Sequence, residues 1–257
     1  MINTILQNKP TKLFLAIATF FVANAIIAEC IGGKIFSLEK LLGFNPLSIN
    51  LLGQQGISVS LTCGVLLWPL EFVITDIVNE YYGPKAVRNI SYVAVALIGY
   101  AFCMFYMAIQ VPAASFWNGT KVNSGVPNMS LAFAAVFGQG MWIIIGSIIA
   151  FMVSQLVDVA IFHKIKKATG DKYVWLRSTG STLVSQLVDS FIVLFIAFYI
   201  GNNWSIQTVL AICMVNYLYK CLVAILLTPL LYFIQHGINT YLGAATAHTM
   251  KQQAMGY

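Results

Sequence analysis

The sequence predicts an all-α integral membrane protein in which residues 1–257 form a single transmembrane domain of six helices. Of its 257 residues, 59% are hydrophobic and only 9% are charged, whereas about 25% of the residues of a soluble domain are charged. A spanning helix needs roughly 20 apolar residues, and stretches of that kind lie near residues 13–31, 57–80, 90–110, 131–163, 175–200 and 207–235. These stretches lack the strict alternation of a membrane β-barrel.

The basic residues predict the orientation in the membrane. If the N-terminus is cytoplasmic, most lysines and arginines fall on the cytoplasmic side, and the outer side carries only Lys34, Lys40 and Lys121. Cytoplasmic loops are enriched in basic residues, so we expect a multi-pass protein with both termini in the cytoplasm. Topology also accounts for the net charge of +6. We therefore expect the lipid bilayer as a partner, and no nucleic acid.

Cysteine and histidine spacing gives no sign of catalysis or metal binding. The five cysteines include no C-x-x-C pair, and none of the three histidines belongs to an H-E-x-x-H motif. These cysteines are typical of small buried hydrophobic residues, and a membrane protease or esterase would need machinery that the sequence does not contain. We therefore expect no metal, no cofactor and no enzymatic activity.

The acidic residues are concentrated in the predicted spans. Only Glu39 and Asp171 fall clearly in loops, and the other six acids lie within spans: Glu29, Glu71, Asp76, Glu80, Asp158 and Asp189. A carboxylate near the bilayer centre costs about 2.5–3.5 kcal/mol, so these positions need an explanation. Glu29 and Glu80 lie near span ends, where we expect access to water. The three aspartates lie deeper, and we predict that they are functional.

The hexapeptide VSQLVD occurs twice, at residues 153–158 and 184–189. Residues three and four apart share one helix face, and each hexapeptide extends a polar stripe: Ser147, Phe151, Ser154 and Asp158 beside Gln155, then Ser178, Thr182, Ser185 and Asp189 beside Gln186. Consecutive spans are antiparallel, so the two stripes are inverted, as in transporters built from inverted repeats. Serine and glutamine could simply bond helix to helix, but that role does not explain the aspartates.

The second span, WPLEFVITDIVNEYYGPK, carries another polar face. Pro69 is expected to kink or break the helix. Glu71 lies around the helix from the polar face and is ambiguous, because it faces the site only if the kink rotates the upper segment. Lys220, at mid-membrane depth, can neutralise one carboxylate, and Arg177 a second. The predicted substrate-binding residues are Phe72, Asp76, Asn79, Glu80, Ser154, Gln155, Asp158, Ser185, Gln186, Asp189 and Lys220.

These motifs together resemble the queuosine precursor transporter family, bacterial membrane proteins similar to vitamin uptake transporters. The resemblance rests on residues from the second span to the sixth: Pro69, Phe72, Thr75, Asp76, Asn79, Glu80, Tyr82, Gly83, Lys85 and Arg88, then Ser154, Gln155, Asp158, Trp175, Arg177, Ser181, Thr182, Ser185, Gln186, Asp189, Lys220 and Thr228-Pro229-Leu230. It implies uptake, through the bacterial inner membrane, of 7-cyano- or 7-aminomethyl-7-deazaguanine or a closely related purine-like base. It also implies a six-helix fold similar to the substrate-binding subunits of energy-coupling-factor importers.

Three functional interpretations stay open at this point. The leading one is an importer that works as a single polypeptide or as a homo-oligomer. The second is a substrate-binding subunit that needs a separate ATP-driven module. The third is a proton or cation channel, or a membrane enzyme with paired carboxylates, although carboxylates alone specify no reaction. Neither the base carried nor the driving force follows from the sequence.

Overall fold

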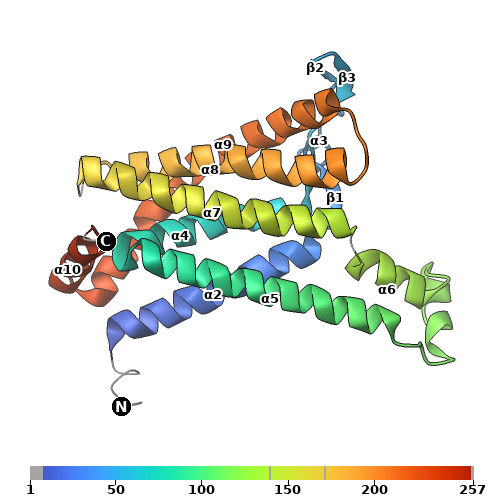
Figure 1. Cartoon of the computed structure of the whole chain (residues 1–257), viewed down its shortest axis with the longest axis horizontal. Coiled ribbons are helices and arrows are strands. Elements are labelled where there is room, and N and C mark those ends of the chain that lie inside the picture. Colours follow the sequence, from blue (N-terminus) through green and yellow to red (C-terminus); the bar gives the residue numbers. More distant parts are fainter. Residues whose placement is uncertain (1–7, 139, 171, 256–257) are drawn as a thin grey trace.

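The protein is a bundle of long helices with short strands gathered at one end (Figure 1). The structure is a computed structural model that describes residues 8–138, 140–170 and 172–255. In that part of the chain, five segments are long and apolar enough to cross a membrane. They are α2 (Lys9–Ile31), α5 (Pro84–Gln110), α6 (Met129–Phe137) with α7 (Met141–Thr169), α8 (Val174–Leu194) with the π-helix η4 (Phe195–Ile200), and α9 (Ile206–Leu242). The chain is therefore a mostly helical, multi-pass membrane protein, as predicted.

The second apolar stretch, residues 57–80, is helical only in part. It contains β4 (Ser60–Thr62), the 3-10 helix η1 (Cys63–Leu66) and the start of α4 (Trp68–Tyr82). Pro69 lies in the first turn of α4. A backbone N–H at this position has no acceptor within the helix, so proline, which lacks one, costs no hydrogen bond there. Pro69 therefore marks the start of the helix. At 1.5 Å per residue, α4 is about 22 Å long, shorter than the roughly 30 Å hydrocarbon core. The count of six spans therefore stays a prediction.

The connections between the helices make the two ends of the bundle different. One end, here called the sheet end, carries β1 (Ile35–Ser37), α3 (Leu38–Leu41), β2 (Ile49–Leu51), β3 (Gln54–Ile57), η2 (Trp117–Gly119) and η3 (Val122–Ser124). There β1 pairs with β4 and β2 with β3, both antiparallel. The opposite end, the α10 end, carries the start of α2, the turn at Gly83 between α4 and α5, and α10 (Ala244–Met255).

Helix α4 lies inside the bundle, in contact with α2, α5, α7, α8, α9 and α10. Every residue from Glu71 to Tyr81 is buried. The outer faces of the surrounding helices are apolar, as Leu226 and Phe233 of α9 illustrate, with exposed fractions of 66% and 75%. The buried residues of α8 are polar: Arg177, Ser178, Ser181, Thr182, Ser185, Gln186 and Ser190. Polar side chains that face inward and apolar ones that face outward are the arrangement expected in lipid.

Glu39 fixes the segment between α2 and α4 at the sheet end. The Val59 amide donates to its Oε1 at 2.6 Å, and the Ser37 hydroxyl donates to its Oε2 at 2.7 Å. The Val59 bond is the main cause that holds the pKa of Glu39 below its ordinary value of 4.5. The carboxylate therefore joins the two halves of this segment, residues 37–39 and residue 59.

We predict that Glu39→Ala speeds hydrogen exchange of the Val59 amide by at least about tenfold, because a bond to a charged group contributes about 1.5–3 kcal/mol. Hydrogen-exchange mass spectrometry of a peptide that contains Val59 measures this rate. Lys40→Ala, in the same short helix, is the control. Because the pKa of Glu39 is lowered in the folded state, the bond contributes its full stability above pH 4.5. This stability is lost as the pH falls through the lowered pKa. Equal exchange in both variants would contradict this role.

Candidate functional site

The larger candidate site is a cavity of about 340 Å³ toward the sheet end, between α2, α7, α8 and α9. This volume lies in the range of roughly 300–1,000 Å³ that is usual for small-molecule sites. Backbone and side chains of β1, β4 and η1 contribute to its wall. Its polar and aromatic lining residues are Glu29, Thr62, Trp68, Ser147, Asp189, Ser190, Phe198, Asn216 and Lys220.

An ion pair and a second carboxylate define the electrostatics of this cavity. Lys220 Nζ lies 2.6 Å from Asp189 Oδ2. The sequence predicted that Lys220 neutralises one carboxylate, and the structure identifies Asp189 as that carboxylate. Ser147 Oγ donates to Glu29 Oε1 at 2.5 Å, and Glu29 lines the same cavity as Asp189. The expectation that Glu29 reaches water at a helix end is wrong, because α7 and α8 cover it and leave it 7% exposed. The cavity therefore offers two carboxylates and one ammonium group.

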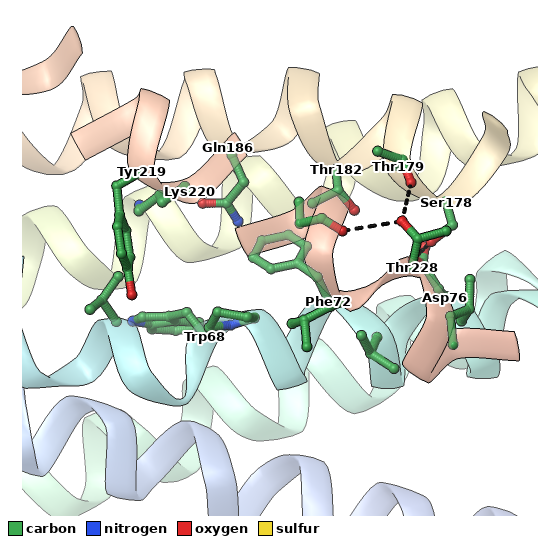
Figure 2. Close-up of a pocket in the computed structure, with 16 residues that line it drawn as sticks. Trp68, Phe72, Asp76, Ser178, Thr179, Thr182, Gln186, Tyr219, Lys220 and Thr228 are labelled. Atoms are coloured by element: carbon green, nitrogen blue, oxygen red, sulfur yellow. Dashed lines mark hydrogen bonds between the residues drawn. The ribbon is translucent and has the colours of Figure 1, made fainter. Parts of the chain in front are cut away.

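A smaller cavity of about 30 Å³ lies between α4, α8 and α9 (Figure 2). Phe72 and Asp76 of α4 face Thr182 and Gln186 of α8 across it. Among the described residues, Asp76 Oδ1 and Gln186 Oε1 are buried with no hydrogen-bond partner. Trp68 and Lys220 line both cavities, so the small cavity adjoins the large one.

The two VSQLVD stripes meet where α7 packs along α8. Asp158 of the first copy accepts a hydrogen bond from Ser185 of the second at 3.1 Å. Asp189 of the second copy lines the larger cavity together with Ser147, which belongs to the first polar stripe. The inverted repeat thus places one aspartate in the larger cavity and the other deep in the bundle, where Asp158 is 1% exposed.

Asp76 of α4 is buried inside the bundle and 3% exposed. The Ser178 hydroxyl of α8 donates to Asp76 Oδ2. Asn79, one turn further along α4, and Gln155, one turn before Asp158 on α7, are also buried. Neither side-chain amide has a hydrogen-bond partner among the described residues.

A buried charge cluster closes the α10 end. Arg177 Nη2 lies 2.6 Å from Glu80 Oε1, and Lys166 Nζ lies 3.2 Å from Glu80 Oε2. Arg177 also donates to the Gly170 carbonyl at 2.6 Å, and Lys251 of α10 lies 3.9 Å from Glu80. Arg177 neutralises an acid, as predicted. The expectation that Glu80 reaches water is wrong, because three helices and α10 enclose it.

The structure divides the predicted substrate-binding residues into two groups. Phe72, Asp76, Gln186, Asp189 and Lys220 line the two cavities. The others line neither of them: Asn79, Glu80, Ser154, Gln155, Asp158 and Ser185. Their placement does not test their role in binding, which stays a prediction.

The predicted set of substrate-binding residues does not include several lining residues of the larger cavity, among them Glu29, Trp68, Ser147, Ser190 and Asn216. Ser147 belongs to the first polar stripe, and Asn216 precedes Lys220 by one helical turn, so spacing gave a usable signal for both. The signal for Glu29 was its charge within a span. Glu71, which was ambiguous, faces α2, where Asn24 Nδ2 donates to its Oε1 at 2.8 Å. Asp171 lies outside the described residues.

We predict that Glu80→Ala lowers the stability of the folded protein by about 3–5 kcal/mol, because it leaves Arg177 and Lys166 buried without their carboxylate. Thermal unfolding of the purified protein in detergent measures the effect. Asp189→Asn is the control, since its partner Lys220 is 14% exposed and can be hydrated. A melting temperature equal to that of the wild type would show that the cluster does not stabilise the fold.

Comparisons with known proteins show the family of the chain. The probable queuosine precursor transporter of Bacillus subtilis is 30% identical over 74% of this chain and 80% of its own length. The queuosine precursor transporter of Escherichia coli is 25% identical over 69% of this chain and 75% of its own. No solved structure matches the chain significantly. The model of the family described as "Putative vitamin uptake transporter" matches residues 62–234, and the chain belongs to this family of transporters, which are not enzymes.

Proposed function

We propose that this protein imports a queuosine precursor, a 7-deazaguanine base, and binds it in the larger cavity. The observation that carries the proposal is the Asp189–Lys220 ion pair, placed beside Trp68 in a cavity of about 340 Å³. The names of the relatives supply the substrate class. The cavity supplies chemistry that suits such a base.

A 7-deazaguanine base presents two adjacent N–H donors on one edge, followed by a carbonyl oxygen. A single carboxylate can accept both N–H groups side by side, and Glu29 and Asp189 are the carboxylates of the cavity. Lys220 can donate to the carbonyl oxygen. The indole of Trp68 offers a flat apolar surface for stacking, an interaction worth about 1–3 kcal/mol per base in other proteins. Each part of the base therefore has a matching group.

We further propose that the α10 end faces the cytoplasm of a bacterial cell and that the sheet end faces outward. The basic residues of α2, α5, α7, α8 and α10 lie toward the α10 end, whereas Lys34, Lys40 and Lys121 lie toward the sheet end. The positive-inside rule favours this orientation. The larger cavity then lies on the outer side, and the Glu80 cluster closes the cytoplasmic side.

In this proposal α4 and the residues before it complete a sixth crossing, which gives a fold similar to the substrate-binding subunits of energy-coupling-factor importers. The chain would work without an ATP-driven module. Uptake by the purified protein in liposomes tests this independence. Base binding without any uptake would favour the binding-subunit alternative.

We predict that the wild type restores queuosine to the tRNA of cells that cannot make the precursor when the base is added to the medium. Asp189→Asn and Lys220→Met should abolish restoration, because each removes one partner of the ion pair. Lys121→Met, in an exposed loop, is the matched control and should restore it. Queuosine content is measured by mass spectrometry of tRNA nucleosides, with membrane levels checked by immunoblotting. Lack of restoration by wild-type protein that is present in the membrane would contradict the proposed substrate.

We also predict that Trp68→Ala weakens binding of the base by about tenfold or more, since it removes a stacking surface. Trp68→Phe should retain much of the affinity, because it keeps an aromatic face. Calorimetric titration of the purified protein with 7-cyano-7-deazaguanine gives the dissociation constants. Equal affinity in all three proteins would exclude stacking on Trp68.

A further inference from the structure

A groove on the surface of the bundle lies between α5 and α7, near the α10 end. The two helices pack against each other, and α5 begins at this end of the bundle, where α7 ends (Figure 1). The groove has a volume of about 260 Å³ and shares no lining residue with the two cavities described above. Its lining residues are Pro84 and Arg88 of α5 with Leu156, Val159, Ala160 and His163 of α7.

The groove is basic toward the α10 end and apolar toward the middle of the bundle. Leu156, Ala160 and His163 are spaced four and three residues apart, so they lie on one face of α7. At 1.5 Å per residue, they extend over roughly 10 Å of the helix. His163 lies nearest the α10 end, and Arg88 lines the groove from the second turn of α5. Leu156 and Ala160 are exposed, so the apolar part is open on the bundle surface.

The charge of Arg88 is not matched within the described part of the chain. Its guanidinium group makes no ion pair and no side-chain hydrogen bond with another described residue. None of the described residues that line the groove is acidic. Lys164 and Lys167 are exposed near the same end of α7 and add to the positive charge there. The groove therefore suits a ligand with a negative group at one end and an apolar body.

We propose that this groove binds an anionic phospholipid, with the phosphate at Arg88 and His163 and the beginning of an acyl chain along Leu156 and Ala160. A guanidinium group can donate two parallel hydrogen bonds to phosphate oxygens, and an imidazole ring N–H can donate another. Basic pockets between membrane helices bind lipid headgroups in this way. A free phosphate ion gains nothing from the apolar wall, so the shape of the groove favours the lipid.

The lipid site goes beyond the proposed function and does not depend on it, because the groove lies outside both cavities. With the α10 end in the cytoplasm, as proposed above, the bound lipid belongs to the inner leaflet. It contacts α5 and α7 at once, and a ligand that binds only the folded protein stabilises that state. Bound lipid should therefore raise the melting temperature of the protein.

The first experiment uses the wild-type protein in detergent and compares three probes. Dioctanoylphosphatidylglycerol carries both the charge and the acyl chains, dioctanoylphosphatidylcholine has the same chains without net charge, and inorganic phosphate has charge without chains. Native mass spectrometry at increasing lipid concentration gives the dissociation constants. The anionic lipid should bind at least about tenfold more tightly than the zwitterionic lipid, and it alone should raise the melting temperature. Inorganic phosphate at the same concentration should not displace it.

The second experiment places the lipid in the groove. Arg88→Gln should weaken binding of dioctanoylphosphatidylglycerol by about tenfold, because it removes the charged donor. Lys164→Gln is the matched control, since it removes the same charge from an exposed position beside His163 that does not line the groove. It should bind the lipid like the wild type.

A third variant tests the shape of the groove with its basic groups intact. Ala160→Trp fills the apolar part and should also weaken binding by about tenfold. Ala96→Trp, at an exposed alanine of α5 outside the groove, is its control and should bind normally. All four positions are exposed, so each variant should melt like the wild type when no lipid is present.

The outcomes decide between the lipid and other ligands. Equal affinity of the wild type for the two lipids would overturn the proposal, as would unchanged binding by both Arg88→Gln and Ala160→Trp. Displacement of the lipid by inorganic phosphate would show that the groove holds a small anion instead. None of these measurements involves the base, so the lipid site and the proposed function stand or fall separately.

Discussion

The burial of α4 is the constraint on which the rest of the structure depends. Within ten residues, this enclosed helix carries Glu71, Asp76, Asn79 and Glu80. Lipid supplies no hydrogen-bond or ion-pair partner for these groups. The surrounding helices therefore supply most of the partners: Asn24 from α2, Lys166 from α7, Ser178 and Arg177 from α8. This requirement explains why the inner face of α8 is polar along its length, although the helix lies in a membrane.

The polar interior changes in character along the bundle axis. At the α10 end, the side chains of Glu80, Arg177 and Lys166 are at most 1% exposed, and α10 covers them. Toward the sheet end, the Asp189–Lys220 pair is partly exposed, to a cavity large enough for a base. A sealed end and a hollow end are what a carrier needs while it accepts a ligand from one side only. The two VSQLVD copies differ in the same way, because Asp158 is buried in the bundle and Asp189 lines the larger cavity.

Much of the candidate site could be predicted from the sequence. A carboxylate within an apolar span costs free energy, so each one indicates a position with a specific role. Lys220 and Arg177 were each predicted to neutralise one carboxylate, and the structure pairs them with Asp189 and Glu80. The turn that ends α4 at Gly83 is also present. Glu29 and Glu80 were misjudged for one reason. Both acids lie near the end of a span, and this position predicted contact with water. Neighbouring helices cover Glu29, however, and helices together with α10 cover Glu80. One sequence does not show which helices are neighbours.

The sequence by itself determined that this chain lies in a membrane and that it carries carboxylates within its apolar segments, since composition and the cost of burying charge act on each residue whatever its neighbours are. Spacing also determined which residues share a helix face. Only the tertiary structure decided which faces meet, and so which acid has a cation, a hydroxyl group or an amide opposite it. It also decided that residues 57–67 are not part of α4 and that Trp68 lines both cavities, because cavities arise where several helices fail to fill the space between them.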